Sequence, residues 1–348
     1  MKMKKIFGLI LATTLIGGIA VGCGAEETPK EEGTGGEAVE ETLKIGVCLY
    51  KFDDTYISTV RQSLQAIEDA NKGKVEFEFV DGKGDQGVQN DAIDTLLQKD
   101  MDLLMVNLVD TGAGQAVVDK IEEEGVPVIL FNREPDVAVI KSYDKALFVG
   151  TNAKEAGVMQ GEILADAWKA NKELDTNGDG IMQYVMLKGE PDNPEAIART
   201  EYSVKTIEEA GIKVEELANQ ICNWDQGLAQ NATEAWLARY NEGIEVIIAN
   251  NDGMAQGAIA ALNAQDLNKG DDTKMIPVVG VDATDAAKDL ISKGFMTGSV
   301  LQDAPAMAQA LYECGLNLIA GKSAIDGTEY KLDESEVAVR IPYKPYIK

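Results

Sequence analysis

Short apolar segments alternate with amphipathic segments along the chain from residue 42 onward. A continuous apolar run of four to eight residues predicts a buried strand, and apolar residues spaced by three or four predict a helix. The expected strands are Leu43–Leu49, Val75–Val80, Leu103–Asn107, Val126–Phe131, Leu147–Gly150, Ile181–Lys188, Val214–Ile221, Val246–Asn250, Val278–Asp282 and Thr297–Leu301. The expected helices include Tyr56–Ala70, Val88–Lys99, Gly114–Glu124, Ala153–Asn171, Glu195–Ala210, Leu228–Tyr240, Met254–Ala264 and Ala304–Ala320.

This alternation predicts an α/β fold with doubly wound parallel sheets. Apolar strands separated by helices are typical of parallel sheets that are covered on both faces. The 348 residues exceed what a single hydrophobic core usually holds, so we expect two such lobes. Ligands of open α/β sheets bind at the carboxyl ends of the strands, which predicts a binding cleft between the lobes.

Polar and aromatic residues follow the ends of the predicted strands. They lie in the segments Tyr50–Tyr56, Phe131–Pro135, Lys188–Arg199, Cys222–Asp225, Ala249–Asp252, Gly280–Ala283 and Leu301–Asp303. Carboxylates, amides and a guanidinium bind adjacent hydroxyls through paired hydrogen bonds, and aromatic faces pack on the C–H side of a pyranose. Together they indicate a sugar site, although each residue alone also fits a helix N-cap or a turn.

The segment Asp175–Gln183 has the spacing of the first part of an EF-hand calcium loop. Oxygen ligands are expected at loop positions 1, 3, 5 and 9, a backbone carbonyl at position 7 and a Gly at position 6. The corresponding residues are Asp175, Asn177, Asp179, Gln183, Ile181 and Gly180. Position 12, which should be Glu, is Met186 within a predicted strand, so a carboxylate from elsewhere must complete the site. The alternative is an ordinary polar turn.

The N-terminus has the pattern of an exported lipoprotein. Lysines precede the apolar run Ile6–Val21, which is too short for a stable membrane span and fits a signal peptide. The run ends at Ala20-Val-Gly-Cys23, which resembles a bacterial lipobox, although Leu is commoner at the position of Ala20. We expect residues 1–22 to be removed and Cys23 to carry lipid. The acidic residues that follow, up to 41, predict a flexible tether.

Composition excludes several function classes. The net charge of −27 argues against nucleic acid as a partner, because phosphate binding needs a basic face. The chain has no His, which excludes Ser-His and Cys-His nucleophile systems. Cys48, Cys222 and Cys314 have no disulfide or zinc spacing, so we expect them to be buried small hydrophobic residues. A hydrolase with paired carboxylates, such as Asp54 and Asp282, is an alternative, but the abundant amides favour binding without catalysis.

The motifs taken together resemble the galactose/glucose-binding proteins of bacterial ABC transporters, from about Leu43 to Tyr343. The matching segments are Tyr50-Lys-Phe-Asp-Asp, Asn107-Leu-Val-Asp, Phe131-Asn-Arg-Glu-Pro, Ser142-Tyr-Asp-Lys-Ala, Val149-Gly-Thr, Leu187-Lys-Gly-Glu-Pro, Ile248-Ala-Asn-Asn-Asp, Gly280-Val-Asp-Ala and Val339-Arg-Ile-Pro-Tyr. The resemblance implies a type I periplasmic-binding-protein fold whose lobes are joined by a three-segment hinge. One lobe would comprise residues 42–150 with 304–338, and the other residues 151–303 with 339–348.

The resemblance also implies roles for the polar residues at the strand ends. A pyranose would lie between Tyr56 and Trp224, held by Asp54, Asn132, Arg199, Asn251 and Asp282. Three further positions depart from the family pattern, since Asn193 replaces a His, Glu195 an Asp and Gln302 an Asn. Tyr56 also stands where a Phe is usual. The longer Glu195 and Gln302 leave open which aldohexose is preferred.

The family closes its calcium loop with a Glu just before the Ile-Ala-Asn-Asn-Asp strand, which implies that Glu245 is the missing ligand of a structural Ca²⁺. The expected function is that of an extracytoplasmic lipoprotein, anchored to the membrane only through Cys23. As a monomer it would deliver a monosaccharide to an ABC permease. Alternatives are a sensor for a chemotaxis or signalling receptor and a binder of the ribose/xylose class. A sugar-responsive repressor is disfavoured, because a lipobox and an acidic tether stand where its DNA-binding helices would be.

Overall fold

The computed structural model describes residues 42–348. The predicted signal peptide, the lipidated Cys23 and the tether up to residue 41 therefore lie outside the described residues. Within the described part of the chain, no helix combines the length and the apolar character needed to cross a bilayer.

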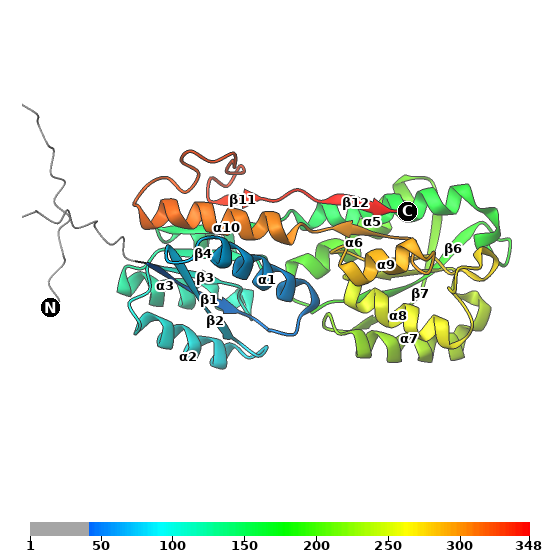
Figure 1. The fold of residues 1–348 in the computed structure, drawn as a ribbon. Coiled ribbons are helices and arrows are strands. Elements are labelled where there is room, and N and C mark those ends of the chain that lie inside the picture. Colours follow the sequence, from blue (N-terminus) through cyan, green and yellow to red (C-terminus); the bar gives the residue numbers. More distant parts are fainter. Residues whose placement is uncertain (1–41) are drawn as a thin grey trace, which may run out of the picture. The chain divides into compact units, whose positions relative to one another are not determined.

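Two six-stranded sheets with the same strand order form the framework (Figure 1). The first sheet is ordered β11 (Ala338–Arg340), β5 (Ala146–Gly150), β4 (Val128–Phe131), β3 (Leu103–Val106), β1 (Leu43–Leu49) and β2 (Val75–Asp81). The second is ordered β12 (Lys344–Ile347), β10 (Gly298–Leu301), β9 (Val278–Val279), β8 (Val246–Ala249), β6 (Ile181–Lys188) and β7 (Lys213–Ile221). Neighbouring strands are parallel except for the β10–β12 pair, which is antiparallel. The expected pair of parallel-sheet lobes is confirmed.

Helices cover both faces of each sheet. Those of the first lobe are α1 (Thr55–Ala70), α2 (Gln86–Leu97), α3 (Gly114–Glu124), α4 (Val137–Lys141) and α10 (Ala304–Ile319). Those of the second lobe are α5 (Ala153–Ala170), α6 (Pro194–Glu209), α7 (Gln226–Tyr240), α8 (Asp252–Ala264) and α9 (Asp285–Ser292). Val47 and Leu49 of β1 pack in a core with α1 and α10, whereas Cys48 points to a core with α2 and α3. This alternation places an apolar side chain on both faces of a buried strand.

The predicted strands are all present, and their ends differ by a few residues. The largest difference is at Val278–Asp282, where the regular strand β9 ends at Val279 and Asp282 forms only an isolated bridge with Leu301. The short strands β11 and β12 were not expected, because each is too short to show a period. Cys48, Cys222 and Cys314 are buried, as expected, and form no disulfide among residues 42–348; burial raises the pKa of the Cys48 thiol to about 12.

The chain crosses between the lobes three times. Two crossings follow β5 and β10, as the resemblance implied. At the third, Val339 and Arg340 still pair with Val149 and Gly150 of the first sheet, so the expected lobe boundary at residues 338 and 339 is placed two residues too early. The crossing itself is formed by residues 341–343, which precede β12.

Candidate ligand-binding cleft

A cleft lies where the carboxyl ends of both sheets meet. It is lined by Tyr50, Asp54, Tyr56, Ile57, Asn132, Arg133, Asn193, Glu195, Arg199, Trp224, Asn251, Asp282 and Gln302. The structure thus brings together all the residues that the sequence placed in a sugar site. Tyr50, Ile57 and Arg133 are lining residues that the sequence analysis did not single out. The remaining cavity measures about 40 Å³, room for a few water molecules only, so a larger ligand enters when the lobes or the lining side chains move apart.

Several buried polar atoms around the cleft have no hydrogen-bond partner within the described residues. Those on lining residues are Arg133 Nε, Arg199 Nε, Trp224 Nε1, Asp282 Oδ2 and Gln302 Nε2. An unsatisfied buried donor or acceptor costs about 1–3 kcal/mol, so native structures rarely retain one without a partner from solvent or ligand. This set offers four donors and one acceptor to a polyhydroxylated ligand.

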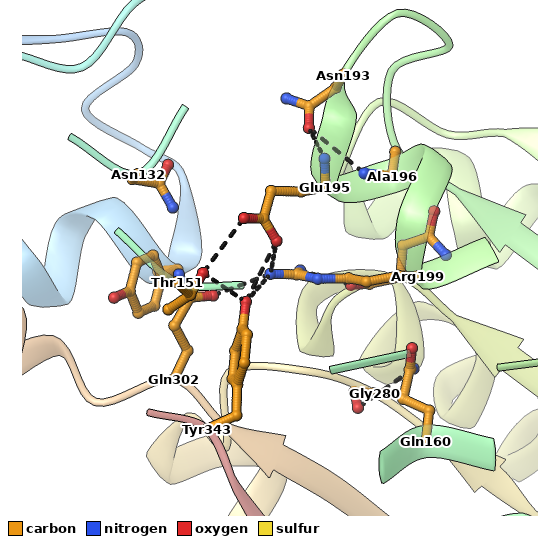
Figure 2. A network of polar contacts seen from close by, with 12 residues as sticks. Asn132, Thr151, Gln160, Asn193, Glu195, Ala196, Arg199, Gly280, Gln302 and Tyr343 are labelled. Carbon is orange, nitrogen blue, oxygen red and sulfur yellow. Dashed lines mark hydrogen bonds and ion pairs between the residues drawn. The ribbon is translucent and has the colours of Figure 1, made fainter. Parts of the chain in front are cut away.

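Three lining residues also cap the helices that begin at this edge. Asp54 Oδ1 accepts a hydrogen bond from the backbone N–H of Ile57 at 2.8 Å, and Asn251 Oδ1 accepts one from Met254 at 2.9 Å. Asn193 Oδ1 accepts one from Glu195 at 2.9 Å (Figure 2). These three residues therefore cap helices and also line the cleft, because the helix caps lie at its mouth.

Arg199 is the most connected side chain of the cleft and is 3% exposed. Its Nη1 donates to the backbone oxygen of Asn250 at 2.8 Å. Its Nη2 donates to Glu195 Oε2 at 2.9 Å and to Gln302 Oε1 at 3.1 Å. Burial opposes the charge, but Tyr343 and Glu195 outweigh it and raise the pKa of Arg199 above its ordinary value. The guanidinium is thus a fixed cation at the centre of the site.

The polar network continues from Arg199 into the hinge. The hydroxyl of Tyr343 lies 2.8 Å from Arg199 Nη2 and 2.8 Å from Thr151 Oγ1, and Glu195 Oε1 accepts from Thr151 at 3.2 Å (Figure 2). Thr151 belongs to the first crossing between the lobes, Gln302 to the second and Tyr343 to the third. Tyr343 was not expected as a site neighbour; its only signal in the sequence was the motif Val339-Arg-Ile-Pro-Tyr.

The backbone around the cleft adopts left-handed conformations at residues other than Gly. Asn132 has φ of 61°, Trp224 of 65° and Asp282 of 116°. Such values are uncommon for residues with a Cβ and concentrate at functional sites. The Trp224 ring packs directly on Gly189, where an added Cβ would lie 2.2 Å from ring atom Cζ2. Gly189 therefore has to be Gly for the ring to keep this position.

Tyr50 and Arg133 extend the cleft toward its rim. The Tyr50 hydroxyl donates to Asp54 Oδ2 at 2.5 Å, and burial together with this carboxylate raises the pKa of the phenol. The guanidinium of Arg133 lies 4.4 Å from the centre of the Tyr50 ring. Arg133, from the first lobe, forms an ion pair with Glu190 of the second. Its position directly after Asn132 at a strand end is a signal that could have identified it.

The Asp175–Gln183 loop has the internal hydrogen bonds expected of a cation-binding loop. Asp175 accepts from the backbone N–H groups of Gly178 at 2.9 Å and Gly180 at 3.0 Å. Asn177 and Asp179 each accept from the residue two positions later. These turns direct side-chain oxygens toward the interior of the loop.

Glu245 reaches this loop from the neighbouring strand connection. Its Oε1 accepts from Thr176 N at 2.7 Å and its Oε2 from Gln183 N at 3.0 Å. Within residues 42–348 no group of three or more Cys, Asp or Glu side chains is spaced to hold a metal ion by itself. The predicted Ca²⁺ set includes the amides of Asn177 and Gln183 and the carbonyl of Ile181, and such a mixed oxygen set fits a hard cation. The metal site stays a prediction.

Comparisons with known proteins agree with the fold. The family described as periplasmic binding protein domain matches residues 45–323. The chain is 41% identical over 302 residues to the D-galactose/methyl-galactoside binding periplasmic protein MglB of Haemophilus influenzae, covering 86% of this chain and 88% of that protein. It is 22% identical over 320 residues to the ribose import binding protein RbsB of Bacillus subtilis, covering 92% and 95%.

A solved structure is similar over nearly the same length. The solute binding protein of an ABC transporter from Bacillus halodurans, with bound myo-inositol, has a TM-score of 0.72 and 26% sequence identity, covering 89% of this chain and 96% of that chain. The expected type I fold is thereby confirmed. The chain belongs to the periplasmic binding protein family, as its sequence motifs indicated.

Proposed function

We propose that this protein captures an aldohexose of the D-glucose/D-galactose class between its two lobes and delivers it to an ABC permease. One observation carries the proposal: five residues that line one cleft with Tyr56 have buried polar atoms without a hydrogen-bond partner among the described residues. They are Arg133, Arg199, Trp224, Asp282 and Gln302. Sugar hydroxyls both donate and accept, so a pyranose satisfies donors and an acceptor at once. The 41% identity to the galactose-binding relative supports the same class.

A ligand of the ribose/xylose class is the second candidate. Glu195 and Gln302 each carry one methylene more than the residues usual in the family, and both side chains point into a cavity of only about 40 Å³. A smaller sugar would leave room for these longer side chains. The lower identity of 22% to the ribose-binding relative favours the hexose.

Closure of the lobes would couple capture to delivery. Asn132 and Arg133 come from the first lobe, whereas Asn251 and Asp282 come from the second. A ligand held by both sets binds the closed form more tightly than the open form and so shifts the population toward it. The closed form is the one that would dock on the permease. A chemotaxis or signalling receptor that recognises the same form is the alternative partner.

The remaining parts of the proposal concern location and metal. The lipobox sequence supports an extracytoplasmic location, with a lipid anchor on Cys23 after removal of residues 1–22. We further propose that the protein is a monomer. The hydrogen bonds of Glu245 to the Asp175–Gln183 loop support a structural Ca²⁺, held by Asp175, Asn177, Asp179, Ile181, Gln183 and Glu245. When bound, the ion would neutralise the loop carboxylates and hold the loop to the strand connection.

A titration of the purified protein with D-glucose, D-galactose, D-ribose and D-xylose, followed by tryptophan fluorescence, tests the proposal. We expect saturable changes with the hexoses, because Trp224 lies in the cleft. A stronger response to a pentose would favour the second candidate. No response to any of them, together with no binding heat by calorimetry, would contradict sugar binding.

A further inference from the structure

Asp282 lines the cleft from a strained backbone segment. Its φ of 116° and the φ of 49° at Ala283 are both positive, and neither residue is Gly. Conformations of this kind are energetically unfavourable and persist only where the surrounding structure holds them. Asp282 is 5% exposed, and its Oδ2 has no partner within the described residues. Contacts with neighbouring elements must therefore hold this segment in the conformation that directs the Asp282 carboxylate into the cleft.

The groups that hold the segment come from the start of α8 and from β10. Asp252, the first residue of α8, accepts at Oδ2 from the backbone N–H of Thr284 at 2.7 Å. Its Oδ1 accepts from the hydroxyl of Ser299 in β10 at 2.6 Å. That hydroxyl in turn accepts from the backbone N–H of Ala283 at 3.0 Å. The two peptide groups that follow Asp282 are thus both held by the Asp252–Ser299 pair.

Asp252 itself does not line the cleft and is completely buried. Its Oδ1 lies so close to β9 that a Cβ added at Gly280 would be 2.3 Å away. Burying a carboxylate near another carboxylate is unfavourable, so hydrogen bonds to its oxygens must offset that cost. Those bonds come from Thr284 and Ser299, and an apolar residue at this position would leave both donors unsatisfied.

We propose that Asp252, acting with Ser299, is a positioning residue that fixes the strained Asp282–Ala283 backbone and thereby directs the Asp282 carboxylate at the ligand. The consequence for ligand affinity rests on the proposed sugar binding. The consequence for the backbone does not, so the two can be tested separately.

The first test measures the backbone without sugar. Amide hydrogen exchange of the full protein reports on Ala283 and Thr284, whose N–H groups bond to Ser299 and Asp252. We expect both amides to be protected in the wild type and to exchange at least tenfold faster in Asp252→Ala, which has no side-chain acceptor for Thr284 or Ser299. If the two amides exchange equally fast in both proteins, the inference is overturned, whatever the protein binds.

The second test is a double-mutant cycle on hexose affinity. We expect Asp252→Ala to weaken binding about tenfold in the wild-type background and to have no further effect in the Asp282→Ala background, because it acts through Asp282. An equal loss in both backgrounds would mean a general structural role and would overturn the inference. A wild type that binds no sugar refutes the proposed function, and hydrogen exchange then decides the inference alone.

Two further variants separate positioning from loss of stability. Ser299→Ala removes only the hydroxyl, and we expect it to reproduce the faster exchange at Ala283 with a smaller loss of affinity. Asn268→Ala is the matched control, since Asn268 is fully buried in the same lobe and its side chain bonds to Ile276 and Phe295 away from the cleft. The control should lower the melting temperature and leave affinity unchanged. Equal affinity losses in Asn268→Ala and Ser299→Ala would contradict the inference.

Discussion

The hydroxyl of Tyr343 lies 2.8 Å from Nη2 of Arg199, which joins a residue of the third crossing to the central cation of the cleft. The same hydroxyl lies 2.8 Å from Thr151 of the first crossing. Hinge segments absorb the backbone rotation when two lobes close. The Tyr343 hydroxyl connects two hinge segments with Arg199. The position of the guanidinium therefore depends on the conformation of the hinge.

Replacing Tyr343 by Phe removes this hydroxyl and leaves the ring. We expect hexose affinity to fall about tenfold, since Arg199 loses a buried, charge-assisted hydrogen bond. Isothermal calorimetry measures the loss. The control is Tyr184→Phe, which removes a hydroxyl bonded to Glu216 in the same lobe and should leave affinity unchanged. Equal affinities for the wild type and Tyr343→Phe would remove the hydroxyl from the binding account.

Trp224→Ala should weaken hexose binding by about 1–3 kcal/mol, because a large aromatic surface is lost from the cleft. The fluorescence change on binding should also become smaller, since the other tryptophans, Trp168 and Trp236, are not lining residues. Calorimetry gives the affinity and fluorescence gives the signal. A variant with wild-type affinity would exclude Trp224 from the site.

Asp54→Ala should weaken hexose binding by roughly 1.5–3 kcal/mol, because it removes a charged acceptor and leaves the Tyr50 hydroxyl unpaired. Asp54 also caps α1, so a second cap variant is needed for comparison. Asp85 caps α2 through Val88 N at 2.9 Å and does not line the cleft. Asp85→Ala should cost about 1 kcal/mol of stability and no affinity. Similar affinity losses in both variants would indicate that only helix capping matters.

Removal of calcium should destabilise the second lobe without abolishing sugar binding. A saturating ion at 100 times its Kd stabilises by about 2.7 kcal/mol, which corresponds to roughly 5–10 °C in Tm for a lobe of this size. Glu245→Gln should melt like chelated wild type, and exposed Glu242→Gln should behave as wild type. Calorimetric melting with and without chelator checks both. A Tm that is insensitive to the chelator would contradict the metal site.

The free energy of unfolding should fall as pH rises between about 4 and 7, because two carboxylates are buried in the cleft and directly behind it. Burial raises the pKa of Asp252 to about 7, and burial with the nearby Asp252 raises that of Asp282. Between its unfolded-state pKa and its folded-state pKa, each carboxyl is protonated in the folded protein but ionised in the unfolded chain. The stability that proton binding contributes is therefore lost as pH rises toward the folded-state pKa. Urea unfolding at several pH values should show a smaller decline in Asp252→Asn than in wild type. Parallel pH profiles for the two proteins would contradict this.

Much of the fold and the site follows from local sequence signals. Buried parallel strands such as Val246–Ala249 are continuous apolar runs, and their carboxyl ends meet at one edge, so residues such as Asn251 could be placed in the cleft from their position alone. Tyr343 could not be placed, because its contact with Arg199 depends on how a distant crossing passes the second turn of α6. The positive φ values at Trp224 and Asp282 also have no local signal, since tertiary contacts impose them.

Calorimetric titration of matched variants from the two lobes tests most directly whether one sugar is held between them. Asn132 belongs to the first lobe and Asn251 to the second, and both line the cleft. We predict one hexose site per wild-type chain and an affinity loss of about tenfold or more in both Asn132→Ala and Asn251→Ala. Wild-type affinity in either variant, or no hexose binding by the wild type, would contradict the account.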